Sequence, residues 1–380
     1  MSGDDAIRIV ALFTLMVLVI VTRAARDWRW GNFTDFEVMR AVGKVVLSGH
    51  GADVYRHVRA FFHPPFFALL CAPLGHLSPR AAYDIVVVVE LALWSAAVAV
   101  WSRLVDAPRG RLVTAWLVAS CAPALWVSLE YGQPAALFLL AIGGAMLLVR
   151  NGREWAAGLA LAWLFVKPPY AAVALVALVP LRAWRTMAAA IAGGASLFAI
   201  GLAAFGVNTT VAWIDTTRRL SATMAQRDWA RQYQQWSLLS AIRTTGLPGV
   251  VALGVYLTAA IGLVAFTLQA LARVHRTGAE STMRDASFAR IASLVTLLVA
   301  VVSPYLFSYD HVLLAGPGVV FACSQEGRPR GSRLAIAACL ALTFVIGFGM
   351  RWIRPFAPMG FVTALWLVWE ARDARSVSAS

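Results

Sequence analysis

The sequence is poor in charged residues, and above all in acids. Only 14% of its 380 residues are charged, with 19 Asp and Glu against 33 Lys and Arg, whereas 60% are hydrophobic. This composition excludes an ordinary soluble domain. Apolar runs long enough to span a membrane recur along the whole chain, which predicts an integral membrane protein.

Motifs of several enzyme classes are also missing. The four cysteines are scattered through apolar segments, and no pair has the spacing of metal ligands; this favours small buried side chains. The chain has no Walker loop, no G-x-S-x-G motif and no H-E-x-x-H motif. The net charge of +14 lies in short basic clusters between apolar runs. We therefore expect contact with anionic membrane lipids and no nucleic acid.

The apolar runs predict an all-α, polytopic membrane protein with about twelve transmembrane helices in one domain, residues 1–380. The predicted spans are 6–22, 82–104, 112–129, 134–149, 155–166, 169–181, 186–206, 247–271, 288–305, 309–323, 334–350 and 356–370. The region before the first span is not basic, so we interpret it as an uncleaved helix rather than a signal peptide. Alternation places the short basic loops on one face, which identifies the cytoplasm.

Two long loops, 23–80 and 207–246, lie on the opposite face in this topology. The first contains an apolar segment, 63–77, that is short and interrupted by prolines. It is expected to be re-entrant or interfacial, because counting it as a span would break the alternation.

Segments with unusual polar residues all fall on the extracytoplasmic face. They are F-T-D-F-E (33–37), the H-P-P segment (63–77), E-Y-G-Q (130–133), K-P-P-Y (167–170), Q-Q-W-S-L-L-S-A-I-R (234–243) and S-P-Y-L-F-S-Y-D-H (303–311). A random scatter would divide them between the two faces. Their convergence predicts a single site that faces the periplasm or exterior.

Asp35 is the acid that stands out. On a helix of about 100° per residue it shares a face with Val42 and Val46, whereas Glu37 points to the side of Arg40. Glu37 is therefore expected to pair with Arg40 in solvent. A carboxylate on an apolar face is either a helix cap or a functional group, such as a general base whose pKa is raised by burial.

Several cations and polar groups accompany this acid. Lys167 lies between apolar runs and before two prolines, so it is either functional or a snorkelling side chain at a helix end. Asp310 and His311 occupy a tight turn; they are either an interfacial pair or part of a phosphate site. Arg243 suits phosphate recognition or a solvated position equally. Carboxylates, amides, aromatic rings and cations beside apolar segments suggest an enzyme that acts on a lipid-phosphate sugar.

The motifs resemble those of glycosyltransferase family 87, the polyprenol-phosphate-sugar-dependent enzymes of the GT-C superfamily. The matching pieces follow the family's order over roughly residues 31–320. They are F-T-D-F-E-V-M-R-A-V-G-K-V-V-L-S-G-H-G-A-D-V-Y, F-H-P-P-F-F-A-L-L-C-A-P-L, Y-G-Q-P-A-A-L, G-L-A-L-A-W-L-F-V-K-P-P, W-S-L-L-S-A-I-R and S-P-Y-L-F-S-Y-D-H-V-L-L. The resemblance implies a GT-C-like fold with a cytoplasmic N-terminus and juxtamembrane helices in the large first outer loop.

The resemblance also implies an activity, and it assigns roles to residues. Asp35 would be the catalytic base, and an inverting reaction without metal or cofactor would transfer mannose from a polyprenyl-phosphate donor to a lipid or glycan acceptor. The donor phosphate is assigned to Lys167, His311 and Arg243. Sugar and acceptor contacts are assigned to Gln133, Glu130, Tyr55, His63, Tyr309 and Asp310. The expected location is the bacterial inner membrane, with the site facing the periplasm.

Two features leave alternatives open. Ala135 stands where the family often has Asn, and the 303–311 segment lacks the Ser-Trp-x-His-His form of the mannolipid enzymes. An arabinofuranosyl transferase of the same family is therefore an alternative. A transporter or flippase of polyprenyl-linked glycans is another, although the sequence has no internal repeat and its polar residues gather on one side.

Overall fold

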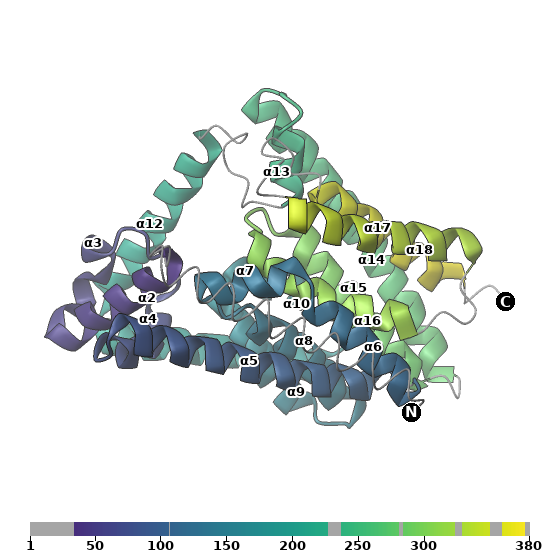
Figure 1. Ribbon diagram of the computed structural model, residues 1–380, viewed down its shortest axis with the longest axis horizontal. Helices are drawn as coiled ribbons and strands as arrows, with labels where there is room; N and C mark the ends of the chain where they lie inside the picture. The colour runs from purple at the N-terminus through teal and green to yellow at the C-terminus, as the bar shows by residue number, and fades with distance from the viewer. Residues whose placement is uncertain are drawn as a thin grey trace.

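A computed structural model of the protein describes residues 34–105, 107–226, 237–280, 284–323, 329–349 and 359–376. These ranges are helical and contain no strand, in agreement with the all-α prediction (Figure 1). The helices are α2 (Thr34–Val45), η1 (Val46–His50), η2 (Gly51–Asp53), α3 (Val54–His57), α4 (Pro65–Gly75), α5 (Pro79–Leu104), α6 (Arg109–Ser120), α7 (Pro123–Tyr131), α8 (Ala135–Arg150), α9 (Glu154–Ala162), η3 (Trp163–Val166), α10 (Pro168–Leu178), α11 (Trp184–Phe205), α12 (Val207–Gln226), α13 (Leu238–Arg243), α14 (Gly249–Glu280), α15 (Arg284–Val302), η5 (Ser308–Leu314), α16 (Ala315–Cys323), α17 (Arg330–Gly349) and α18 (Met359–Ser376).

Three of the described helices are long and apolar enough to cross a membrane. They are α5, α11 and the Gly249–Arg276 part of α14, and the bent pair of α6 and α7 is a possible fourth. These helices make the chain a membrane protein. The count of twelve spans stays a prediction, and the predicted span at 6–22 lies outside the described residues.

The predicted span 112–129 is bent rather than straight. Helices α6 and α7 meet at an angle of 52°. Pro123 is the first residue of α7, and the preceding Ala122 has an extended backbone, with φ −62° and ψ 134°. A residue before proline is sterically pushed out of the helical conformation, so the chain changes direction there.

The core is built around α15, which packs against α8, α14, α16 and α18. Every residue from 291 to 301 is buried. A helix that is apolar on all sides is stable only when other helices surround it. Helix α8 packs on α5, where the Trp101 indole donates to the Leu139 carbonyl at 3.0 Å.

Residues 34–75 include a pair of short helices, α2 and α4, which pack together at one end of the molecule (Figure 1). The two backbones lie in close contact at Gly43. A Cβ added to this glycine would lie only 2.3 Å from the Cys71 carbonyl oxygen. The segment 207–246, expected as a long loop, begins with the 20-residue helix α12. Two hydrogen bonds join α12 to the chain between α2 and α4. The Thr209 hydroxyl donates to Ala52 O, and the Trp213 indole donates to Phe62 O.

Replacing Gly43 by alanine is expected to destabilise the protein by about 1–3 kcal/mol, because the new methyl group meets backbone atoms that cannot rotate away. Gly144→Ala on α8 is the control, since no atom lies within 4 Å of its added Cβ. There we expect no loss, or a gain of up to about 1 kcal/mol. Thermal unfolding of the detergent-solubilised variants measures both, and equal melting temperatures would refute the close contact.

Candidate active site

Asp35 lies in the first turn of α2 and faces the turn that follows α7. The Gln133 amide nitrogen donates to the Asp35 carboxylate at 3.1 Å. Gln133 is buried, at 4% exposure. On the other side of the helix, Arg40 is paired with Glu37 at 3.0 Å, which confirms the expected pairing. The two acids of this segment therefore have different surroundings, and only Asp35 faces the protein interior.

Gly132 makes this contact possible. It ends α7 in the left-handed conformation, with φ +65°, and a Cβ there would lie 3.1 Å from the side chain of Phe36. Glycine is the usual residue at such a helix end because it carries no Cβ. The turn therefore places Gln133 next to α2 while α2 packs closely against it.

Glu90 supports the same turn, and our sequence analysis did not single it out. It lies on α5 and is 2% exposed. Its carboxylate accepts from the Ala136 amide at 2.8 Å and from the Ser128 hydroxyl at 3.0 Å. The signal was available, because an acid inside an apolar run, V-V-V-V-E-L-A-L-W, is costly and is by default a functional candidate.

Lys167 and Asp310 form a buried ion pair across 143 residues of sequence. The lysine ammonium lies 2.5 Å from Asp310 Oδ1, and the side chains are 13% and 0% exposed. The ammonium also lies 4.9 Å from the ring centre of Tyr309, in cation–π geometry. The second Asp310 oxygen accepts from the Phe307 amide at 3.1 Å. The pair is thus surrounded by groups that hold both charges in place.

The chain around Lys167 is irregular for a clear reason. Helix α9 tightens into the 3₁₀ turn η3, and Lys167 then leaves the helical conformation, with φ −124° and ψ 88°. Pro168 and Pro169 follow and begin α10. Proline excludes the helical conformation from the residue before it, so Lys167 sits at a break between helices.

Asp35 lies close enough to the Lys167–Asp310 pair to be affected by both charges. Burial is the largest effect, and it raises the pKa of the Asp35 carboxyl. The hydrogen bond from Gln133 and the charge of Lys167 lower that pKa, whereas the charge of Asp310 raises it. The net direction is upward, which moves the carboxylate toward the range useful for accepting a proton.

His63 and Tyr55 lie behind Lys167. The His63 ring nitrogen is 3.5 Å from the Val166 carbonyl, adjacent to Lys167, and the Tyr55 hydroxyl donates to the His63 carbonyl at 2.6 Å. Both side chains are almost fully buried. The structure therefore brings these two predicted residues to the Lys167 side of the site.

A cavity of about 500 Å³ opens beside Lys167. Its walls come from the segment before α4, the start of α10, the inner face of α12 and the 303–307 segment. Apart from Lys167 and His63 they are mainly apolar and aromatic, and they include Phe62, Val166, Pro168, Pro169, Tyr170, Trp213, Leu220, Pro304, Tyr305 and Phe307. Among the described residues, Lys167 is thus the cation that borders this largely apolar space.

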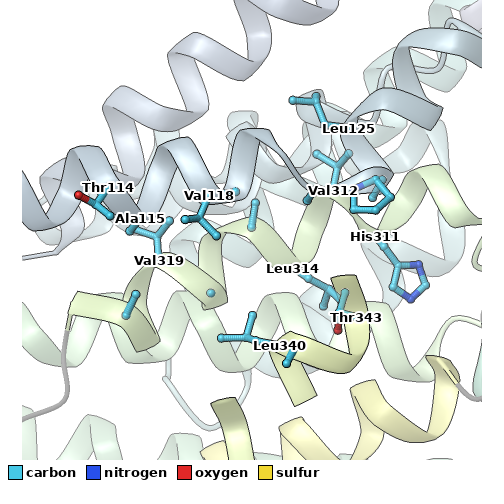
Figure 2. Close-up of a pocket in the computed structure, with 18 of the residues that line it drawn as sticks. Thr114, Ala115, Val118, Leu125, His311, Val312, Leu314, Val319, Leu340 and Thr343 are labelled. Carbon is cyan, nitrogen blue, oxygen red and sulfur yellow. The ribbon is translucent and has the colours of Figure 1, made fainter. Parts of the chain in front are cut away.

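His311 follows Asp310 but faces a different cavity. This second cavity has a volume of about 440 Å³ and is lined mostly by apolar side chains of α6, α7, η5, α16 and α17. Figure 2 shows His311 at one end of it and Thr114 at the other. The turn η5 therefore sends Asp310 toward Lys167 and sends His311 away. His311 and Lys167 thus line different cavities, and the assignment of His311 to the donor phosphate stays a prediction.

The remaining predicted residues lie at the edges. Arg243 is the last residue of α13; burial lowers the pKa of its guanidinium, and Tyr305, which lines the Lys167 cavity, raises it. Glu130 is half-buried near the end of α7. The neighbouring Tyr131 ring lies 6.1 Å from the ring of Tyr309, so the α7 end and η5 meet beside Lys167. No cluster of three metal-ligating side chains occurs in the described ranges.

The model of glycosyltransferase family 87 matches residues 61–304. The chain belongs to this family. The match confirms the resemblance seen in the sequence motifs, and it makes the protein a membrane glycosyltransferase that needs a sugar donor and an acceptor. His63, Glu130, Gln133, Lys167 and Arg243 lie inside the matched region. Asp35, Tyr55 and the 309–311 turn lie outside the matched region. The packing of the helices brings them next to the matched residues.

Neither the curated proteins nor the solved structures include a match to this chain.

Proposed function

We propose that this family 87 protein transfers a sugar from a polyprenyl-phosphate donor to a hydroxyl of a lipid- or glycan-linked acceptor. The sugar proposed is mannose. The reaction proceeds with inversion and takes place at the extracytoplasmic face of the bacterial inner membrane. The observation that carries the proposal is Lys167 at the border of a largely apolar cavity, close to the half-buried carboxylate Asp35.

A lipid phosphate needs both an apolar cavity and a cation at its border. A polyprenyl chain favours apolar and aromatic walls, and its phosphate favours a cation at their border. Lysine has three donors, of which one is directed to Asp310 Oδ1. The others suit phosphate oxygens. As the bond between the sugar and the phosphate breaks, negative charge grows on the leaving phosphate, and a fixed ammonium stabilises that charge.

Asp35 is the proposed base. The acceptor hydroxyl transfers its proton to the Asp35 carboxylate while its oxygen forms a bond to the anomeric carbon. The bond from that carbon to the donor phosphate breaks on the opposite side, and polyprenyl phosphate leaves. A β-linked donor thus gives an α-linked product. Gln133 holds the carboxylate in position, and burial supports the raised pKa that a base requires.

The proposal is tested with purified protein in lipid vesicles. Radiolabelled polyprenyl-phosphate mannose is offered with a crude membrane-lipid acceptor pool, and EDTA is present throughout. We expect a labelled lipid or glycan product. A product formed from polyprenyl-phosphate arabinose alone would assign the arabinofuranosyl alternative. Absence of a product with every polyprenyl-phosphate sugar would reject the proposed donor class.

A further inference from the structure

A hollow of about 540 Å³ lies at the end of α10 opposite to Lys167. The 11 residues of α10 separate the two by about 16 Å. The hollow is lined by Val179, Pro180 and Arg182 from the connection between α10 and α11, by Trp184 at the start of α11, and by Ala272, His275 and Arg276 from α14. Two basic segments that lie about 90 residues apart in the sequence therefore meet around one space.

Arg182 has an unusual backbone. It is the non-glycine residue with positive φ among those described, at +52°. The Arg182 amide donates to Val179 O at 3.0 Å, and the Ala183 amide donates to Leu178 O at 3.4 Å. This pattern ends a helix with a left-handed residue, a position that glycine usually occupies. An arginine at this position keeps a backbone strain that glycine would avoid, which indicates that its side chain has a role.

The hollow combines cations with an interfacial aromatic ring. Arg182, His275 and Arg276 are exposed, and Trp184 is 53% exposed. The Arg276 Nε donates to the Ala272 carbonyl at 3.2 Å, which positions its guanidinium at the wall. Arginine matches phosphate oxygens in a bidentate geometry, and exposed tryptophan is typical of the headgroup level of a membrane.

We propose that this hollow binds the headgroup phosphate of an anionic phospholipid in the leaflet opposite to the active site. Arg182 and Arg276 contact the phosphate from two sides, and Trp184 lies at the level of the glycerol backbone. The site is separate from the glycosyl-transfer chemistry. It does not depend on the identity of the donor or acceptor.

The full-length, detergent-solubilised protein tests this proposal by native mass spectrometry with phosphatidylglycerol or phosphatidylcholine. We expect the wild type to retain phosphatidylglycerol preferentially. Arg182→Gly and Arg276→Gln should each weaken that retention about five-fold, as expected for one cation at a membrane surface. Arg153→Gln removes the same charge from another exposed loop that does not line the hollow, and it should bind like the wild type.

Melting temperatures provide a second readout, because a lipid that binds only the folded state stabilises it. Without lipid, Arg182→Gly should melt at or above the wild-type temperature, since glycine relieves the strain at positive φ. Added phosphatidylglycerol should raise the wild-type melting temperature more than that of the variant. Equal lipid retention by all variants would overturn the proposal. So would equally tight binding of water-soluble glycerol phosphate, since that result would assign the hollow to a free anion.

Discussion

Replacing Asp35 by asparagine is expected to reduce sugar transfer by about 100- to 10,000-fold, the usual contribution of a general base. Asparagine has nearly the same shape and keeps an oxygen that accepts the Gln133 hydrogen bond. It cannot take up the proton of the acceptor hydroxyl. Donor binding and the melting temperature should therefore change little while the turnover number falls.

Glu37→Gln is the matched control for this variant. Glu37 lies two residues away on the same helix but pairs with Arg40 on its outer side. Removing this charge should alter transfer less than about three-fold, because the Glu37 side chain, 40% exposed, pairs with Arg40 on its own helix and not with the site. Initial rates in vesicles compare the two variants directly. If Asp35→Asn transferred sugar as fast as Glu37→Gln, Asp35 would not be the base.

The pH dependence follows from the same carboxylate. A base must be ionised to accept a proton, so activity is present above its pKa and disappears as the pH falls through it. Burial raises the pKa of Asp35 above its ordinary value of 3.8. The acidic limb of the rate profile should accordingly lie above that of a solvated aspartate, and Asp35→Asn should remove it.

Replacing Lys167 by methionine is expected to have the second large effect, on both stability and transfer. The substitution leaves the fully buried Asp310 carboxylate without its ion partner. Breaking one side of a buried pair typically destabilises a protein by about 3–5 kcal/mol. The proposed phosphate contact is lost at the same time, so transfer should fall even in molecules that remain folded.

A double variant separates these two effects. Lys167→Met combined with Asp310→Asn removes both charges, and the asparagine oxygen can still accept from the Phe307 amide. It should recover most of the melting temperature but none of the transfer activity. Thermal unfolding and donor-dependent initial rates measure the two properties. Recovery of activity together with stability would show that Lys167 has only a structural role.

The local features of the site were predictable because they depend on neighbouring residues. The apolar face of α2 separates Asp35 from Glu37, and the prolines after Lys167 predict the helix break there. Two expectations were incomplete for the same reason. Helix α12 was expected only as part of a loop, and the bend within the predicted span 112–129 was not expected, because both depend on how the helices pack.

The sequence alone determined that this protein is a helical membrane glycosyltransferase, since composition, hydrophobic runs and motif order are properties of the chain itself. Only the tertiary structure decided which polar residues meet. Lys167 pairs with Asp310 across 143 residues of sequence, and Asp35 pairs with Gln133 across 98. Glu90 accepts from the amide of Ala136, at the start of α8, across 46 residues. The direction of His311, away from Asp310 and into another cavity, likewise follows from the geometry of η5. No sequence period links such distant groups, because burial and packing of whole helices set the distances between them.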